Sequence, residues 1–237
     1  MYKSQTIIAI VPARGGSKGI KDKNIIDFGG KPLIYHSIKA ALDSKYIDEV
    51  FVSTDSEKIA QAAKECGANV PFLRPAEFAT DDAPTNLAIM DMLNKLTNQR
   101  KKRYDHIMLL QPTSPLRETK HIDEAVKMYF DSGFENLVSV KPLEDGLELI
   151  YSREGDGSLK KFLQDDNHSA RRQDFKKYYV LNGAIYLTNV KRYLTNGGFY
   201  SGRTLSYVMD TESSVDIDNM LDLELARLIY KKRKELR

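Results

Sequence analysis

The sequence predicts an α/β fold with a doubly wound, mostly parallel sheet, because short β-branched segments alternate with segments that carry apolar residues at helical spacing. Such alternation favours parallel strands joined by helices that cover both faces of the sheet. A length of 237 residues suits one large domain, or a core domain with a smaller appendage. Hydrophobic residues make up 41% and charged residues 29% of the chain, a balance typical of a folded globular protein.

Six strands are predicted where β-branched and other apolar residues run together: Thr6–Val11, Glu49–Ser53, Val70–Leu73, His106–Leu110, Asn136–Val140 and Val180–Leu187. The predicted helices are Leu33–Leu42, Glu57–Cys66, Thr85–Leu96, Ile122–Phe130 and, closing the domain, Met220–Lys232. Ligands of such sheets bind at the carboxyl ends of the strands. Polar residues that follow a predicted strand are therefore the candidates for function.

The alternation stops between residues 141 and 178, where the chain is charged, irregular and interrupted by Asp-Gly and Gly-Asp-Gly turn signals. Five apolar residues in this stretch require burial, namely Leu147, Leu149, Ile150, Tyr151 and Phe162. We therefore predict a small inserted subdomain at 141–178, and a core made of residues 1–140 and 179–237.

Composition argues against several classes of protein. A formal net charge of +3 is too small for a nucleic-acid-binding protein, whose basic residues would dominate a face. The single cysteine, Cys66, cannot form an intrachain disulfide, which fits a reducing compartment. The apolar run Ile7–Val11 is too short for a signal peptide, and no stretch approaches the roughly 20 apolar residues that span a bilayer. We expect a cytoplasmic protein that binds neither nucleic acid nor membrane.

A glycine-rich basic loop follows the first predicted strand and predicts a phosphate-binding site, because glycines let backbone N–H groups approach an anion and cations neutralise its charge. The residues that we predict to bind nucleotide there are Arg14, Gly15, Gly16, Ser17, Lys18, Lys23 and Asn24. Gly19 follows Lys18 where a Walker A motif needs Ser or Thr, and the dinucleotide fingerprint G-x-G-x-x-G is absent. These mismatches argue against a kinase-type ATPase and an NAD-dependent dehydrogenase. A flexible basic surface loop is the alternative.

Two aspartates near the C-terminus predict a metal site. In an extended segment, Asp216 and Asp218 point to one face and Ile217 to the other. Paired carboxylates with no nearby His or Cys suit Mg²⁺ held partly by phosphate and water. The residues alone leave open an acidic turn in which Asp218 caps the final helix. Asp55 ends a strand before a helix, and we expect it to act as an N-cap as readily as to contact nucleotide.

Six segments, in order, resemble the sugar nucleotidyltransferases and specifically the cytidylyltransferases that activate sialic acid and related nonulosonic acids. The segments are Pro12–Asn24, Val52–Asp55, Leu73–Glu77, Leu110–Arg117, Asn182–Tyr186 and Asp216–Asp218. The resemblance implies a Rossmann-like nucleotidyltransferase fold and transfer of CMP from CTP to the anomeric hydroxyl of N-acylneuraminate, with release of pyrophosphate. It further implies Mg²⁺ on Asp216 and Asp218, with Lys23 and the same two aspartates as catalytic residues.

The resemblance also implies substrate contacts. Arg74 and Thr85 match positions that contact the cytosine and ribose. The residues matched to the acidic sugar are Gln111, Arg172, Asn182, Tyr186, Phe199 and Tyr200. Among these, Arg172 can clamp the sugar carboxylate through its guanidinium, and Asn182 and Tyr186 fall on a strand edge facing the site. The aromatic pair Phe199 and Tyr200 matches residues that reach the sugar across a homodimer, and the segment 141–178 contributes to that homodimer. The alternatives are a structural turn for Gln111, a buried tyrosine for Tyr186, and a core aromatic pair.

Two departures from the family pattern concern the sugar pocket. Many members carry a His-Pro dipeptide and then a lysine after the strand matched by 137–140, whereas this chain reads Pro142-Leu143-Glu144. Leu181 stands where a proline usually precedes Asn-Gly. Neither departure affects cytidylyl transfer, but both leave the sugar open to legionaminic acid, pseudaminic acid or Kdo. A non-catalytic sugar-nucleotide-binding protein is the alternative from a different class.

Overall fold

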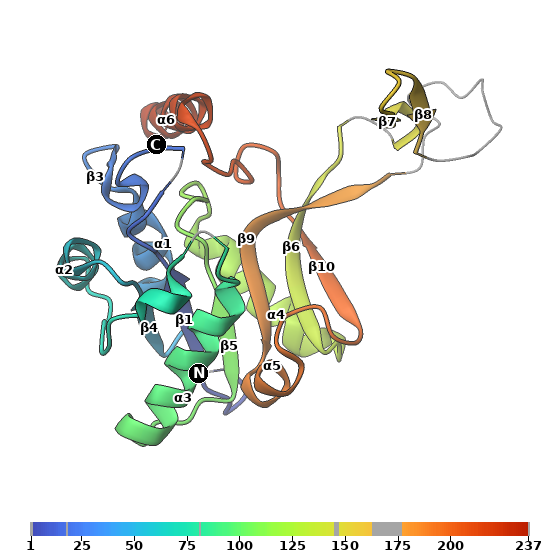
Figure 1. Cartoon of the computed structure of the whole chain (residues 1–237). Coiled ribbons are helices and arrows are strands. Elements are labelled where there is room, and N and C mark those ends of the chain that lie inside the picture. The colour runs from blue at the N-terminus through green and yellow to red at the C-terminus, as the bar shows by residue number, and fades with distance from the viewer. Residues whose placement is uncertain (1, 18, 81, 145–146, 163–176, 237) are drawn as a thin grey trace.

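The structure is a computed structural model of the chain, and it describes residues 2–17, 19–80, 82–144, 147–162 and 177–236. A six-stranded sheet in the order β10-β6-β9-β5-β1-β4 forms its centre (Figure 1). The strands are β1 (Ile7–Pro12), β4 (Glu49–Ser53), β5 (His106–Leu109), β6 (Asn136–Pro142), β9 (Tyr179–Asn189) and β10 (Thr204–Val208). Within this sheet β9 alone runs antiparallel to its neighbours, β5 and β6, so the predicted mostly parallel sheet is confirmed.

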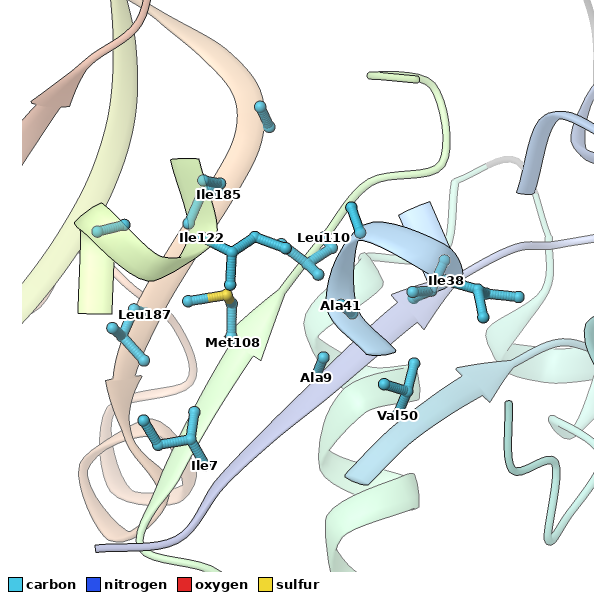
Figure 2. Packing of buried hydrophobic residues seen from close by; sticks show 14 of the residues in the cluster. Ile7, Ala9, Ile38, Ala41, Val50, Met108, Leu110, Ile122, Ile185 and Leu187 are labelled. Carbon is cyan, nitrogen blue, oxygen red and sulfur yellow. The ribbon is translucent and has the colours of Figure 1, made fainter. Parts of the chain in front are cut away.

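Helices cover both faces of the sheet, as the doubly wound prediction requires. They are α1 (Leu33–Leu42), α2 (Glu57–Glu65), α3 (Thr85–Arg100), α4 (Thr119–Ser132), α5 (Val190–Asn196) and α6 (Met220–Glu235). On one face, Ile38 of α1 and Ile122 of α4 belong to the same buried cluster as Leu187 of β9 (Figure 2). On the other face, Ile89 of α3 and Tyr193 of α5 belong to a second cluster.

The central strand β1 shows why the sequence folds this way. Its residues from Ile7 to Val11 are fully buried, because a strand between two parallel neighbours is covered on both faces and is apolar throughout. Ile7 and Ala9 pack toward α1, whereas Ile8 and Ile10 pack toward α3. Because alternate side chains of β1 point to opposite faces and all of them are apolar up to Val11, polar groups begin only at the carboxyl end of the strand.

The C-terminal helix α6 builds a third apolar cluster beside the sheet. Leu223 and Ala226 of α6 pack with Phe28, Leu33 and Leu116, and so close the domain as predicted. Phe28 lies in a small hairpin of β2 (Asp27–Phe28) and β3 (Lys31–Pro32). Among the described residues, no helix has the length and apolar composition that crossing a membrane requires.

Three predictions about the elements need correction. The predicted strand Val70–Leu73 is wrong, because the segment joins the sheet only through one bridge, from Asn69 to Phe51. Pro71 lacks the N–H that a further ladder bond would need. The prediction also omits β10 and α5, which are short elements of five and seven residues. Three 3₁₀ turns complete the described elements: η1 (Lys23–Ile25), η2 (Ala76–Phe78) and η3 (Leu147–Leu149).

Strand β9 contains a bulge that aims its backbone at the carboxyl edge of the sheet. Its pairing with β6 runs from Tyr186 opposite Val138 to Leu181 opposite Val140, so residues 182–185 have no regular partners. Gly183 within the bulge has φ +74°, a left-handed conformation that favours glycine. A bulge re-aims side chains and backbone at the end of a strand.

Beyond the bulge, β6 and β9 run out of the body and carry a hairpin of β7 (Tyr151–Arg153) and β8 (Leu159–Lys161) (Figure 1). The apolar side chains expected to need burial are largely exposed in this arm: Leu149 is 51%, Tyr151 48% and Phe162 64% exposed. Nothing in the described part of the chain covers them.

Candidate active site

A cavity of about 570 Å³ opens at the carboxyl ends of β1 and β5. Its lining residues are Pro12, Arg14, Ser17, Gly19, Lys23, Asn24, Arg74, Thr85, Gln111, Pro112, Thr113, Asp216 and Asp218. The cavity thus brings together most of the predicted nucleotide-binding residues, the acidic pair and one predicted sugar-binding residue. This is where a doubly wound sheet places its ligands.

The glycine-rich loop is held against the end of β4. The N–H of Gly15 donates to Oδ1 of Asp55 at 2.8 Å, and a Cβ on Gly15 would lie 3.1 Å from the Cβ of Ser56. Asp55 therefore fixes the loop, and Ser56 is the residue that caps α2, through its hydroxyl and the N–H of Ile59. The expectation that Asp55 acts as the N-cap is wrong.

The same loop contacts the acidic segment on its other side. A Cβ on Gly19 would lie 2.2 Å from the carbonyl oxygen of Asp218, so only glycine allows this approach. Lys23 Nζ donates to the carbonyl oxygen of Ile217 at 2.7 Å and lies 3.4 Å from Oδ1 of Asp218. Lys23 therefore joins the loop to the acidic pair, and its largely buried side chain places a positive charge between them.

The acidic pair has the alternating arrangement that the sequence predicts. Ile217 is fully buried and its N–H donates to the carbonyl oxygen of Thr113 at 2.9 Å, while Asp216 and Asp218 both line the cavity. The helix cap is Asn219, not Asp218, so the capping alternative for Asp218 is wrong. Burial raises the pKa of Asp216, partly offset by the Thr113 hydroxyl.

The donor atoms around this pair suit a hard cation. Oδ1 of Asp216 is buried and without a hydrogen-bond partner among the described residues, and so is Oδ1 of Asn24. The Asp218 carboxylate, by contrast, is 77% exposed. Oxygen donors of this kind match the preference of Mg²⁺. No cluster of three or more His, Cys, Asp or Glu side chains forms within the described ranges, so any cation here would need phosphate or water as further ligands.

Gln111 faces this site from the end of β5. A Cβ on Gly183 would lie only 2.6 Å from Oε1 of Gln111 and 3.8 Å from Oδ2 of Asp216. The bulge in β9 therefore lets the Gln111 amide lie close to the acidic pair. The role of Gly183 was not predicted, although the Asn182-Gly183 dipeptide is a sequence signal for a left-handed turn.

Two other predicted residues of β9 do not line the cavity. Asn182 is 4% exposed, and its amide accepts from Ser139 Oγ at 2.5 Å and donates to Ser214 Oγ at 2.9 Å. Its side chain thus holds the bulge in place. Tyr186 is also buried, and burial raises the pKa of its hydroxyl. The expectation that both fall on a strand edge is wrong, because β9 lies inside the sheet between β6 and β5.

The predicted aromatic pair packs on Tyr186. The ring centroids of Tyr186 and Phe199 lie 5.4 Å apart, and those of Tyr186 and Tyr200 lie 6.2 Å apart. Phe199 is buried in the second core cluster, whereas Tyr200 is 58% exposed. Phe199 therefore has a core role within the chain, and Tyr200 is the member of the pair that a ligand or partner can reach.

The remaining predicted residues divide into two groups. Arg74 lines the cavity but is itself buried, with Nη2 donating to the carbonyl oxygen of Ser53 at 2.6 Å, so it also fixes the end of β4. Thr85, the first residue of α3, is exposed and lines the cavity, whereas Gly15 and Gly16 lie in the loop without lining it. Lys18 and Arg172 lie outside the described residues.

Sequence reasoning missed the role of Arg117. This guanidinium is buried, with Nε donating to the carbonyl oxygen of Ala184 at 3.0 Å and Nη2 donating to that of Gln111 at 2.9 Å. It therefore ties the Gln111 loop to the bulge of β9. The available signal was a charged residue inside the stiff, apolar segment Pro115-Leu116-Arg117, at a predicted ligand edge.

A cationic glycine-rich loop that faces paired carboxylates at the carboxyl edge of a Rossmann-like sheet defines the nucleotidyltransferase class. A family model described as cytidylyltransferase matches residues 8–236. The chain belongs to the cytidylyltransferase family.

Individual relatives agree with this assignment. The chain is 40% identical to an N-acylneuraminate cytidylyltransferase of Escherichia coli O18:K1:H7, over 96% of this chain and 52% of the relative, so it spans about half the length of that relative. It is 37% identical to a CMP-N,N'-diacetyllegionaminic acid synthase of Legionella pneumophila, over 97% of this chain and 98% of the relative. A solved structure of CMP-2-keto-3-deoxy-manno-octonic acid synthetase complexed with CTP shares the fold, with a TM-score of 0.69, 17% identity, and coverage of 96% of this chain and 99% of that chain.

Proposed function

We propose that the chain transfers CMP from CTP to the anomeric hydroxyl of a nonulosonic acid, with N-acylneuraminate as the first candidate. The observation that carries this proposal is the contact of Lys23 with the Asp216–Asp218 segment inside one cavity that Arg14 also lines. It supports a site in which the triphosphate lies between the loop cations and the acidic pair.

In the proposed reaction, the anomeric hydroxyl loses its proton to water and its oxygen forms a bond to the α-phosphorus of CTP. The bond from the α-phosphorus to the oxygen that bridges to the β-phosphate breaks, and pyrophosphate leaves. Such transfers depend on positioning and charge neutralisation. In this proposal Lys23 and Arg14 neutralise phosphate charge, and Arg74 and Thr85, which line the same cavity, contact the nucleoside. Mg²⁺ held by Asp216 and Asp218 would stabilise charge on the phosphate oxygens. Gln111, held beside Gly183, binds the sugar.

Pyrophosphate release tests the reaction. Purified protein with Mg²⁺ and CTP should release pyrophosphate only when an acceptor sugar is present. Asp218→Asn should lower turnover by about a hundredfold or more, because it removes a carboxylate of the acidic pair. The fold should be kept, because the Asp218 carboxylate is exposed and Lys23 is its only side-chain partner among the described residues. Asp131→Asn, at an exposed aspartate remote from the cavity, is the matched control. Normal turnover by Asp218→Asn would refute the role of the acidic pair.

The acceptor should be identified in the same assay with a panel of N-acetylneuraminic, legionaminic, pseudaminic and Kdo sugars. Legionaminic acid is the second candidate, because the chain matches the Legionella pneumophila synthase nearly end to end. Release with one sugar names the substrate. No release with any sugar or nucleoside triphosphate would favour a sugar-nucleotide-binding protein instead. The need for CTP and the single cysteine favour a cytoplasmic location.

We infer that the protein works as a homodimer in which the arm at 141–178 forms an inserted subdomain that packs on a second copy. The exposed apolar side chains of the arm support this inference, since isolated proteins rarely leave so many large apolar groups together in water. Light scattering at micromolar concentration should give twice the 27.0 kDa chain mass. Phe162→Asp should lower that mass toward the mass of a monomer. A wild-type protein that is itself monomeric would refute the inference.

A further inference from the structure

Residues 209–219 join β10 to α6 without forming a helix or a strand, and they carry the acidic pair near their end (Figure 1). The N–H of Met209 donates to the carbonyl oxygen of Val140 at 2.8 Å, and the next backbone bond from the segment to another part of the described chain is that of Ile217. Between these two points, side-chain contacts determine where the segment lies. The same contacts therefore determine where Asp216 and Asp218 are held.

Residues 210–215 fold into a tight turn, which we call the acidic turn. The carboxylate of Asp210 accepts from the N–H of Ser213 at 2.7 Å and from its hydroxyl at 2.8 Å, and the hydroxyl of Ser214 donates to the carbonyl oxygen of Asp210 at 2.6 Å. A further tie comes from β9, because Nδ2 of Asn182 donates to Oγ of Ser214 at 2.9 Å. The acidic turn is thus attached to the bulge of β9 and leads directly into the acidic pair.

Arg233, near the end of α6, joins the acidic turn to the segment that follows Gln111. Its Nη2 donates to Oγ of Ser213 at 3.0 Å, and its Nη1 donates to the carbonyl oxygen of Leu116 at 3.3 Å. The side chain is only 21% exposed. A guanidinium can hold several acceptors at once because its N–H donors form a rigid fork. Arg233 therefore fixes the distance between two segments that both contribute to the cavity.

Charge gives Arg233 a second role in the acidic turn. Arg233 lies within 3.4 to 3.6 Å of the carboxylates of Asp210 and Glu212, and it is the only Lys or Arg paired with either acid within the described ranges. Carboxylates this close along the chain repel one another unless a cation offsets them. Lys23 supplies that cation at the acidic pair, and Arg233 supplies it at the turn. The acids of this stretch are Asp210, Glu212, Asp216, Asp218 and Asp222.

We propose that Arg233 is a positioning residue that holds Asp216 and Asp218 in place for a divalent cation before any substrate binds. Arg233 does not line the active-site cavity, so it acts through the acidic turn. Loss of a residue that orients metal ligands costs about 10- to 100-fold in metal affinity. Because Arg233 holds the turn and not the carboxylates themselves, we expect the lower end of that range. The use of the cation in transfer rests on the proposed function, whereas cation binding does not.

The binding test uses Mn²⁺ alone as the probe, with the full-length chain, and water-proton relaxation measures the affinity. Arg233→Ala should weaken Mn²⁺ binding about tenfold, and Asp216→Asn, which removes one of the two carboxylates, should abolish it. Arg192→Ala is the matched control and should leave the affinity unchanged. Arg192 is also an ion-paired arginine, 3.2 Å from Glu135 and 34% exposed, but it follows the end of β9 that pairs with the start of β5, away from the cavity.

Two milder variants keep the proposal testable if Arg233→Ala fails to fold. Arg233→Lys keeps the charge but loses the fork, so the affinity for Mn²⁺ should fall about threefold. Ser213→Ala removes the hydroxyl that accepts from Nη2 and should weaken binding by a similar factor. Combining the two should add little, because both break the same contact. Mn²⁺ affinities of these variants equal to that of Arg192→Ala, or no binding of millimolar Mn²⁺ by the wild type, would overturn the proposal.

Kinetics separate this role from a general loss of stability. In the pyrophosphate assay, the Mg²⁺ concentration that gives half the maximal rate should rise about tenfold in Arg233→Ala, in proportion to the lost affinity. The KM for CTP at saturating Mg²⁺ should change by less than about twofold, because Arg233 lies outside the cavity. An unchanged Mg²⁺ requirement would refute the positioning role even though the reaction stands. If the wild type releases no pyrophosphate, the proposed function fails, and the Mn²⁺ affinities alone decide the role of Arg233.

Discussion

Replacing Gly183 by alanine tests whether the bulge of β9 positions Gln111. The new Cβ would lie 2.6 Å from Oε1 of Gln111, so the amide must retreat by about 0.8 Å to reach the 3.4 Å of ordinary contact. The φ of +74° adds backbone strain of about 1–2 kcal/mol for an L-residue. Thermal unfolding should therefore occur about 2–8 °C lower in a chain of this size.

The kinetic effect should be specific to the sugar. A displacement near 1 Å can cost about a hundredfold in rate, so kcat/KM for the acceptor should fall by about 10- to 100-fold. The KM for CTP should change by less than about twofold, because Gln111 lies on the sugar side of the proposed site. Steady-state pyrophosphate release with each substrate varied in turn measures both constants.

Gly133→Ala is the matched control. Gly133 has φ +68° at the end of α4, and nothing lies within 4 Å of its missing Cβ. This variant should show the same loss of thermal stability with unchanged kinetics. If Gly183→Ala is as active as Gly133→Ala, the Gln111 amide does not determine sugar binding. If both KM values rise together, the bulge supports the whole cavity rather than the sugar side.

Three further variants test the nucleotide side of the site. Gly19→Ala places a Cβ 2.2 Å from the carbonyl oxygen of Asp218, so turnover should fall by about a hundredfold, and a normal rate would contradict the close approach of loop and acidic pair. Asp216→Asn should resist urea better than the wild type at pH 7 while losing activity. Because burial raises the folded pKa of Asp216, the unliganded protein loses stability as pH rises from the unfolded value of about 3.8 through the folded one, and the amide removes that loss; equal urea midpoints at pH 7 would refute this reasoning. Asp55→Ala removes the acceptor of the Gly15 N–H and should raise the KM for CTP about tenfold, whereas an unchanged KM would show that the loop does not need this anchor.

Local pattern predicted most of the sheet because each parallel strand is buried on both faces. The continuous apolar run Ile7–Val11 predicts a buried strand, and the apolar run before Gln111 predicts β5 for the same reason. The segment around Pro71 was misread because its apolar residues resemble a strand although its backbone cannot extend the ladder. β10 pairs with β6, a partner distant in the chain, and its five residues carry no local signal of that pairing.

For the site, residue type predicted the cavity and the acidic pair but not the roles within the scaffold. Asp216 and Asp218 lie as their spacing requires. Asn182 and Arg74, however, form hydrogen bonds with Ser139 and Ser53 of the scaffold, and only the three-dimensional arrangement shows these bonds. The same holds for Arg117, whose partners Ser37, Gln111 and Ala184 come from three segments that are far apart from one another in the sequence.

The position of β9 has a consequence for the order in which the chain can fold during synthesis. The strands β1, β4 and β5 and the helices α1 to α3 are complete by residue 109, yet the free edge of β5 waits for residues 179–189. Until β9 leaves the ribosome, that edge presents unpaired backbone groups that invite pairing with other chains. β9 then pairs with β5 on one side and with β6, which has already been synthesised, on the other, and β10 adds to the far side of β6 afterwards. Sheet completion is therefore a late, long-range event, and nascent chains that stop before residue 189 are the ones most prone to aggregate.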